Sequence, residues 1–466
     1  MQNKEQQRMD NNSPSGMSPI ERRASISLAA IMATRMLGLF MILPVFALYA
    51  ESLPDATPML IGLAIGIYGL TQALLQIPFG MASDKFGRRG MITLGLILFA
   101  VGSVVAASAD SLMGIIVGRA LQGAGAVAAV IMALTADLTR EEQRTKAMAI
   151  IGMSIGSAFT LALVAGPLLN SWIGVSGIFW FTAILALLAI VILWTLVPQP
   201  TQSHMHHDAQ LDPSLTLSVL GDTQLLRLDA GIFILHTILT ATFIVVPFVL
   251  RDSLGIDVGL HSWVYLPVLV LSAGAMVPFI IVAEKKRKMK QLFVSAVTIL
   301  GLSLLTMSQW YENAIAFFIL LWLFFTAFNF LEASLPSLVS KTAHAARKGT
   351  AMGVYSSSQF LGAFVGGSAG GVLYGEFGIG GVFSFSALLI AVWWVLAITM
   401  RQPSYLSNLV MPVQNLDAAQ ASELAGKLET VAGVVEAVVL IEENEVYLKV
   451  DNKLLDRDTL QELIPS

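Results

Sequence analysis

Cysteine is absent from the 466 residues of this chain. Its absence excludes structural disulfides, thiolate metal sites and cysteine nucleophiles. Charge is also scarce, because Asp, Glu, Lys and Arg make up only 12% of the chain, against about 25% in an ordinary soluble domain. A Gly-x-x-x-x-Gly-Lys-Ser/Thr loop, which cradles phosphates in many ATP-driven proteins, does not occur. Neither a water-surrounded domain nor a P-loop ATPase fits this composition.

Long apolar runs take the place of the missing charge. Apolar residues make up 56% of the chain, and they gather in runs of roughly 20 to 27, enough for an α-helix to cross the hydrocarbon of a bilayer. We count twelve such runs and expect an all-α polytopic membrane protein with two six-helix halves. The expected spans start near Ser25, Met59, Met91, Leu112, Ala147, Gly177, Leu226, Trp263, Leu292, Ala314, Thr350 and Gly381.

Positive charge is concentrated in alternate loops between the predicted spans, and cytoplasmic loops carry an excess of Lys and Arg. With an even number of spans, this pattern places both termini in the cytoplasm. The first 23 residues are polar and lack the apolar stretch of a removable signal peptide. The basic positions are Arg22, Arg23, Lys85, Arg88, Arg89, Arg140, Arg144, Lys146, Lys285, Lys286, Arg287, Lys288, Lys290, Lys341, Arg347 and Lys348.

Changes of composition divide the chain into five parts. A polar linker rich in Pro, Ser, Thr, Asp and His separates the two halves. After the last span the pattern changes to short alternating strands and helices, which read βαββα, one strand short of a ferredoxin-like repeat. The predicted parts are a cytoplasmic segment 1–23, a first half 24–197, a cytoplasmic linker 198–224, a second half 225–402 and a soluble α+β ferredoxin-like domain 403–466.

The predicted C-terminal domain is acidic, with eleven Asp or Glu against four Lys or Arg in residues 405–466. Its expected strands are 409–413, 434–441 and 445–450, and its expected helices are 417–430 and 456–464. A three-stranded sheet leaves strand edges open, and an open edge can pair with a second copy. We therefore expect an interaction or regulatory domain that can self-associate.

The turn after the second span, at residues 80–89, reads Gly-Met-Ala-Ser-Asp-Lys-Phe-Gly-Arg-Arg. Its glycines permit a tight turn, its aspartate can cap the next helix, and its arginines resist entry into the membrane. At every defining position the turn resembles the loop signature of the major facilitator superfamily of transporters. This resemblance implies a conformational gate made by Gly80, Asp84, Lys85, Gly87, Arg88 and Arg89.

Two further segments resemble the drug/proton antiporter branch of that superfamily. Span four contains Arg119-Ala-Leu-Gln122-Gly123, and span five contains Gly166-Pro167, although the glycines that flank this pair in the family are only partly present. The resemblance implies proton-driven efflux of a small molecule across a bacterial inner membrane. It also implies that Asp137, at the end of span four, pairs with Arg88; a fixed charge at a helix end is the alternative.

Charged side chains inside the apolar runs are the candidates for function. Arg35 and Arg119 lie near mid-membrane, where a charge costs at least about 2.5 to 3.5 kcal/mol, so both should face the interior and have a partner. With Gln122, they are candidates for the substrate cavity or for charge pairing. His236 and Glu332 are the only clearly titratable groups that we place inside the spans of the second half, and we expect them to bind the coupling proton. The alternative is a structural role for the two arginines, a satisfied packing histidine for His236, and a structural hydrogen bond to a neighbouring helix for Glu332.

Small residues in spans two and eleven would let helix backbones approach each other, although close packing without function explains them equally well. Gly366 and Gly370 are the principal packing candidates in span eleven, together with Gly166 and Pro167 in span five.

We expect no cofactor, no metal site and no nucleic-acid partner. His204, His206 and His207 could bind a metal, but in a polar linker they are better explained as part of a polar tract. The expected partners are a small-molecule substrate, protons and the lipid bilayer, and the chain is not expected to be an enzyme. Two other functions stay open: uptake by proton symport, and a transporter-like sensor that signals through residues 405–466.

Overall fold

The structure is a computed structural model, and it describes residues 16–199, 213–344, 347–402, 407–413, 416–441, 445–451 and 454–463. Residues 1–15 of the predicted N-terminal segment lie outside this description. The same holds for residues 200–212 of the predicted linker, which include the three histidines considered above.

In the described part of the chain, ten helical segments are long and apolar enough to cross a membrane. Two of them bend where α-helical structure is interrupted by a few residues, between α2 and α3 and between α6 and α7. The helices of the first half are α2 (Pro19–Phe40), α3 (Leu43–Ala50), α4 (Pro58–Phe86), α5 (Arg88–Ala107), α6 (Leu112–Ala124), α7 (Ala128–Asp137) and α8 (Glu141–Thr195). Those of the second half are α9 (Pro213–Leu220), α10 (Thr223–Phe248), α11 (His261–Lys285), α12 (Met289–Trp310), α13 (Ala314–Thr342) and α14 (Lys348–Ile398).

The two longest helices each make two crossings. At 1.5 Å per residue, the 55 residues of α8 and the 51 of α14 would extend about 77 to 83 Å, far beyond a hydrocarbon core of about 30 Å. Each contains one glycine with positive φ, Gly174 at 67° and Gly378 at 64°, a conformation that glycine adopts readily. The chain reverses at these glycines, so the ten segments provide twelve crossings, and the predicted fold class is confirmed.

Helix starts follow from local capping chemistry. The Ser18 side chain accepts a hydrogen bond from the Glu21 amide while the Glu21 carboxylate accepts one from the Ser18 amide, which is a complete capping box. Asp222 caps α10 by accepting bonds from Gln224 and Leu225, and Asn313 caps α13 in the same way. These caps satisfy amide groups that would otherwise be unpaired at the ends of the helices.

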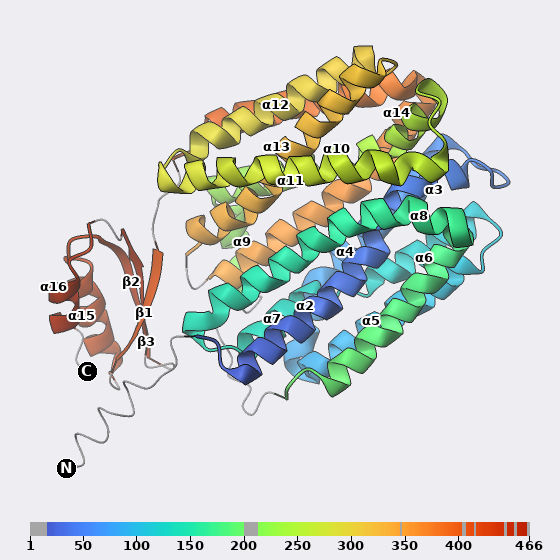
Figure 1. The fold of residues 1–466 in the computed structure, drawn as a ribbon. Coiled ribbons are helices and arrows are strands. Elements are labelled where there is room, and N and C mark those ends of the chain that lie inside the picture. Colours follow the sequence, from blue (N-terminus) through green and yellow to red (C-terminus); the bar gives the residue numbers. More distant parts are fainter. Residues whose placement is uncertain are drawn as a thin grey trace.

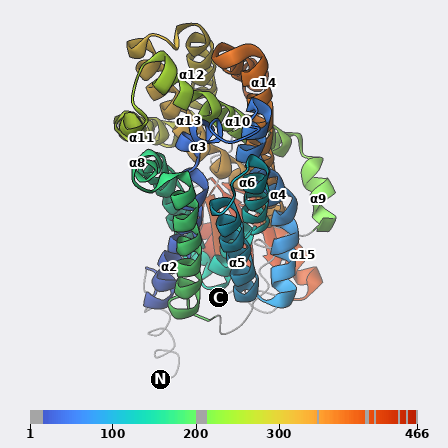
Figure 2. The same cartoon turned by 90° about the vertical axis from the view of Figure 1, so that its right-hand side faces the viewer.

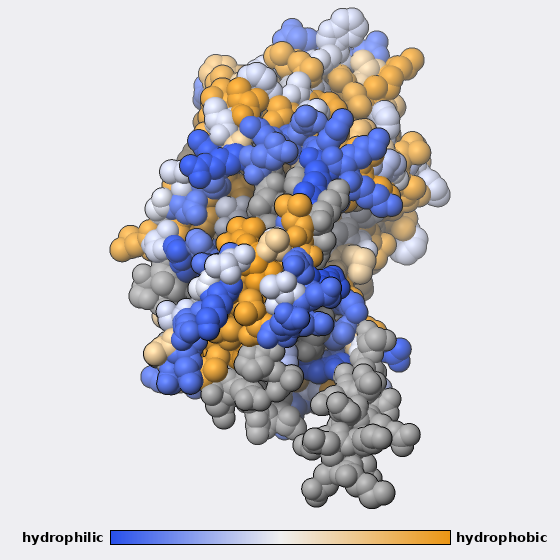
Figure 3. All heavy atoms as spheres, turned by 90° about the vertical axis from the view of Figure 1, so that its left-hand side faces the viewer, coloured by the Kyte–Doolittle hydropathy of each residue, from blue (hydrophilic) through white to orange (hydrophobic). Residues whose placement is uncertain are grey.

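Two groups of helices form the body of the molecule. In Figures 1 and 2, α10 to α13 group on one side and α2, α4, α5 and α6 on the other. The chain enters α2 and leaves α14 at the same end of the body, next to a small separate domain (Figure 1). We call this the terminal end. Figure 3 looks onto it and shows many hydrophilic side chains, whereas exposed apolar side chains such as Leu187, Leu271 and Leu388 cover the helix flanks, as expected for surfaces that face lipid.

The small domain at the terminal end is a three-stranded antiparallel sheet with two helices. Its strands pair in the order β1-β3-β2, and buried apolar residues such as Leu428, Val446 and Leu460 form its own core. Both ends of this order are open edges. The elements are β1 (Ser407–Pro412), α15 (Ala418–Leu428), β2 (Val434–Leu440), β3 (Glu445–Val450) and α16 (Arg457–Leu463), which confirms the predicted βαββα pattern.

This domain contacts two loops of the second half. Arg287, between α11 and α12, donates two hydrogen bonds to the Asp451 carboxylate, at 2.7 and 3.1 Å. Between α13 and α14, the Ala343 carbonyl accepts a bond of 2.8 Å from Lys449, and His344 lies 2.9 Å from Glu436. The acidic domain is therefore held by two side chains and one backbone carbonyl of these loops.

The contact at Glu436 is sensitive to acid. Partial burial acts to raise the pKa of this carboxyl, but hydrogen bonds from His344 and Lys449 outweigh it and hold the pKa below its ordinary value. A lowered carboxyl pKa stabilises the contact at neutral pH, and this stabilisation is lost as the pH falls through the lowered value.

Residues 405–466, expressed alone, are expected to fold, because they have a core of their own. Stability should be marginal, since about 60 residues bury only about 60% of the surface of the unfolded chain. Circular dichroism on heating should show one cooperative transition. A featureless melting curve and the spectrum of an unfolded peptide would contradict the assignment of an independent domain.

Candidate functional site

The two predicted proton-site residues lie together in the second half. Gln359 on α14 uses both hydrogens of its amide group, one toward Nε2 of His236 on α10 at 2.9 Å and one toward Oε1 of Glu332 on α13 at 3.1 Å. Nδ1 of His236 lies 3.9 Å from Oε2 of Glu332, which is beyond hydrogen-bond distance. Three helices thus bring a carboxyl and an imidazole together around one amide group.

The cluster has access to both polar and apolar surroundings. The His236 side chain is 9% exposed and the Glu332 side chain is 34% exposed. The Oε2 atom of Glu332 is nevertheless buried, and it has no hydrogen-bond partner among the described residues. The ring of Phe328 lies 6.1 Å from that of His236. Aromatic rings, among them Phe159 of the first half and Phe325 of the second, continue from there across the interface.

Arg35 is buried in the first half, and none of the described residues gives it an acidic partner. Its Nη2 donates to Oε1 of Gln72, and Gln72 donates to Gln76 at 2.6 Å. The guanidinium carbon lies 5.9 Å from the centre of the Tyr68 ring and 6.0 Å from that of Phe99. Nε and Nη1 have no partner among the described residues, so Arg35 retains two donors for another ligand.

Arg119 is also buried near Tyr68, 5.3 Å from the ring centre. It donates to the backbone carbonyls of Ala64 at 3.2 Å and Ile65 at 3.1 Å, which ties α6 to α4. Gln122 accepts from Arg119 at 3.4 Å and donates to Ser103 at 2.8 Å. The partners of Arg119 are therefore neutral groups. Together with Gln122, this arginine connects α4, α5 and α6.

The glycine-containing turn after α4 forms an ion-pair cluster at the terminal end. Arg88 pairs with Asp84 and with Asp137, the latter at 3.1 Å, and donates to the Ser83 hydroxyl at 2.6 Å. Gly87 has φ of 89°, which a residue with a side chain rarely adopts. The cluster joins α4, α5 and α7, all of the first half.

The remaining residues of this turn point elsewhere. Arg89 donates to the carbonyls of Leu193 at 2.9 Å and Val197 at 2.5 Å, which ties α5 to the end of α8. Lys85 lies over the ring of Phe86, 5.7 Å from its centre, and the Gly80 carbonyl accepts from Ser83 at 2.6 Å. Of the six predicted gate residues in this turn, Arg88 therefore pairs with Asp137, and Asp84 pairs with Arg88.

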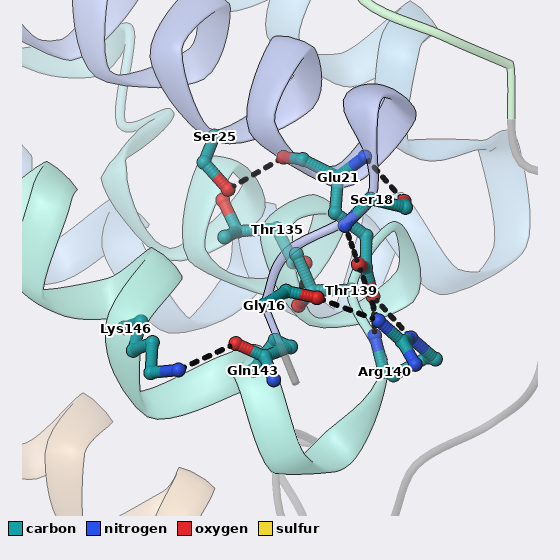
Figure 4. Close-up of polar contacts among 9 residues, drawn as sticks. All are labelled: Gly16, Ser18, Glu21, Ser25, Thr135, Thr139, Arg140, Gln143 and Lys146. Atoms are coloured by element: carbon teal, nitrogen blue, oxygen red, sulfur yellow. Dashed lines mark hydrogen bonds and ion pairs between the residues drawn. The ribbon is translucent and has the colours of Figure 1, made fainter. Parts of the chain in front are cut away.

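A second polar cluster at the terminal end was not predicted (Figure 4). Glu21, at the start of α2, accepts from the Arg140 guanidinium at 3.0 and 3.1 Å and from its backbone amide at 2.8 Å. The Arg140 side chain also donates to the Gly16 carbonyl at 3.2 Å. This cluster holds the start of α2 against the turn between α7 and α8. The Arg88–Asp137 pair and the Glu21–Arg140 pair therefore both stabilise the terminal end of α7.

The predicted packing glycines lie at close helix contacts. A Cβ at Gly366 would meet the Thr237 backbone of α10, and one at Gly370 would come within 3.0 Å of Ala241. A Cβ at Gly166, which precedes Pro167 in α8, would meet the Met41 carbonyl at the bend between α2 and α3. These contacts alone leave the choice between packing and a role in motion open.

One sequence interpretation is wrong. His236 and Glu332 are not the only titratable groups inside the spans of the second half, because Asp229 on α10 is 6% exposed. It follows the expected start of this span, Leu226, by three residues, and α10 itself begins at Thr223. Gln359, Gln72 and Gln76 were also missed. Polar residues within otherwise apolar spans are the signal that could have found them.

The chain resembles known transporters along nearly its full length. The family model described as "Major Facilitator Superfamily" matches residues 28–367. The "Inner membrane transport protein YajR" of Escherichia coli (strain K12) is 45% identical over 452 residues, which cover 96% of this chain and 98% of that protein. An "Uncharacterized transporter" of Buchnera aphidicola subsp. Schizaphis graminum is 34% identical over 380 residues, which cover 81% of this chain and 97% of that protein.

Solved structures share the fold at low sequence identity. The human organic anion transporter MFSD10 matches with a TM-score of 0.63 and 20% identity, over 82% of this chain and 100% of that one. A bacterial homologue of the human lysosomal transporter Spinster, in an inward-facing and occupied conformation, matches with a TM-score of 0.69 and 12% identity, over 82% and 97%. These identities are too low to carry more than the fold.

Proposed function

This chain belongs to the major facilitator superfamily, a family of secondary transporters rather than enzymes, and we propose that it exports a small molecule in exchange for protons. The observation that carries the proposal is the cluster of Glu332, His236 and Gln359. The second half provides groups that bind and release a proton, whereas Arg35 and Arg119 of the first half keep their charge at physiological pH. Export rather than uptake rests on the antiporter-like segments at Arg119 and at Gly166.

A proton gradient can drive such export. One proton that moves down a potential of 100 mV releases about 2.3 kcal/mol. This is enough for roughly fifty-fold accumulation of a neutral solute, since about 1.4 kcal/mol corresponds to a factor of ten.

We further propose that the terminal end faces the cytoplasm, because the basic loops lie there. Contacts between the halves then gather toward the outer side. Arg251 pairs with Glu51 at 3.0 Å, and Ser262 donates to the Val164 carbonyl at 2.7 Å. Glycines of α4 and α14 meet over the same outer part. This arrangement supports a cavity that opens to the cytoplasm in this state, with the halves rocking about it.

The direct test is a screen for solute-dependent proton flux with the purified protein in liposomes. Candidate solutes are added against an imposed proton gradient, and internal pH is followed with a trapped dye. A solute that releases protons from protein-containing liposomes, and not from empty ones, identifies the substrate. Flux that requires Na⁺ and leaves the pH unchanged would contradict proton coupling.

The cluster of Asp84, Arg88 and Asp137 is proposed as the gate. Asp84→Asn should leave the affinity for the solute found by the screen within a few-fold of wild type, because the cluster is far from mid-membrane. Transport should slow sharply, since Arg88 loses one of its two carboxylate partners. Equilibrium binding and the initial transport rate measure the two effects.

Asp110→Asn is the matched control for the gate, because Asp110 is exposed near the other end of α5 and should change neither quantity. If Asp84→Asn weakens binding as much as it slows transport in a folded protein, the gate assignment is wrong.

A sensor is the second candidate, and the contact of residues 405–466 with two loops of the second half favours it. Deleting the domain separates the two functions. A transporter should retain substantial flux, whereas a sensor should lose its output. We also propose that the open edges of the β1-β3-β2 sheet can pair with a second copy.

A further inference from the structure

Asp229 is a buried acid outside the cluster of Glu332, His236 and Gln359. Its residue is 6% exposed, and neither carboxylate oxygen has a hydrogen-bond partner in the part of the chain that the structure describes. A buried carboxylate without a partner is costly, so burial favours the form that has bound a proton. This residue therefore needs an explanation beyond packing.

The position of Asp229 relates it to the cluster. It precedes His236 by seven residues on α10, which places the two on the same helix face about 10 Å apart along the axis. Because α10 begins at Thr223 at the terminal end, Asp229 lies between the cluster and that end. A proton that enters or leaves through the terminal end would pass this depth.

Tyr355 on α14 is a buried polar residue of the same region. It is 4% exposed, and it precedes Gln359 by four residues, which places both on one face of the helix. Tyr355 lies near both acids, and a phenol provides neither of them with a positive counter-charge.

The helices that pack against α10 provide few other charged groups. α14 presents Tyr355, α13 presents Glu332, and α10 itself presents His236 to this region. None of the described residues on these helices, or on α3, α4 and α9, provides a hydrogen bond to Asp229. A counter-charge that would hold the acid permanently ionised is therefore absent among the described contacts.

We propose that Asp229 is a second proton-binding site of this carrier, placed between the Glu332 site and the terminal end. Its use in transport rests on the proposed function, but proton binding itself does not. Protonation adds one O–H bond at a carboxylate oxygen, and the proton comes from water at the terminal end. The second half then binds two protons, one at each acid, instead of one.

Infrared difference spectroscopy of the full-length protein tests this inference without a substrate. Spectra of the protein in lipid, recorded between acidic and alkaline pH, report the C=O stretch of protonated carboxyl groups. Two buried carboxyl bands are expected for wild type. Asp229→Asn should remove one band, Glu332→Gln should remove the other, and Asp229→Glu should keep both.

The chain provides a matched control on the same helix. Asp222 lies seven residues before Asp229 and caps α10 through backbone hydrogen bonds. Because asparagine caps equally well, Asp222→Asn should leave both buried bands unchanged. If Asp229→Asn does not fold, ¹³C labelling of aspartate carboxyls in wild type shifts the Asp229 band and leaves the Glu332 band in place.

A folded Asp229→Asn protein that retains both bands, or a wild-type spectrum in which aspartate labelling shifts no buried band, overturns the proposal. The outcome is separate from that of the coupling proposal. If Asp229 titrates but Glu332→Gln retains proton-driven accumulation, proton coupling through Glu332 fails while the second site stands.

Discussion

Glu332→Gln is expected to abolish proton-driven accumulation while exchange of substrate down its own gradient continues. Glutamine has nearly the same shape and can still accept the hydrogen bond from Gln359, but it cannot bind and release a proton. Inverted vesicles measure the first quantity as the ratio of internal to external solute, which should fall to about one. Counterflow with labelled solute measures the second.

His236→Gln is the informative companion, because it removes the other titratable group and leaves the Glu332 carboxyl. Its effect should be smaller. Glu284→Gln is the control, since Glu284 is an acid at the terminal end of α11 that pairs with Lys341 at 2.8 Å. If Glu332→Gln accumulates solute like wild type at equal protein level, Glu332 is not the coupling group, and His236 and Asp137 become the candidates.

Gly366→Ala is expected to destabilise the second half, although alanine is the better helix former. The added Cβ would meet the backbone of Thr237, with the Thr237 carbonyl carbon and Cα at 2.8 Å. Backbone atoms cannot rotate away, so α10 and α14 must separate. Overpacking of this kind costs about 1 to 3 kcal/mol, which should lower the melting temperature by several degrees in a size-exclusion thermostability assay.

Gly156→Ala is the matched control, because nothing lies within 4 Å of a Cβ at Gly156 in α8. It should be neutral or slightly stabilising. Equal melting temperatures for both variants would mean that α10 and α14 are not in the close contact described here.

The membrane spans and the C-terminal elements could be predicted because each depends on one local quantity. Apolar length decides whether a helix crosses the bilayer, and the runs before and after Gly174 and Gly378 are each long enough. The alternation of apolar and polar residues indicates where strands form, and β3 was predicted with its observed bounds, 445–450. Hydropathy does not show where one span ends and the next begins when no polar loop separates them. We expected new spans to start near Gly177 and Gly381, and the structure places the breaks at Gly174 in α8 and Gly378 in α14.

The site was predicted in part, because the pairing of residues across helices is not local. Glu332 and His236 were found as charged or titratable residues in apolar runs, but Gln359, which holds them together, is neutral and follows three serines. Arg119 was expected to have a partner, and the Ala64 and Ile65 carbonyls provide it. Every residue has a backbone carbonyl, so the sequence does not indicate which carbonyl will accept a hydrogen bond.

The attachment of the C-terminal domain has a mechanical consequence. Arg287, Ala343 and His344 all belong to loops of the second half, so the domain should rotate with that half as one body. Because it projects beyond the bundle (Figure 1), it acts as a lever arm, and its tip sweeps a larger arc than any helix end. A spectroscopic label on α16, paired with one on the turn before α5, would magnify a small rocking angle into a measurable displacement.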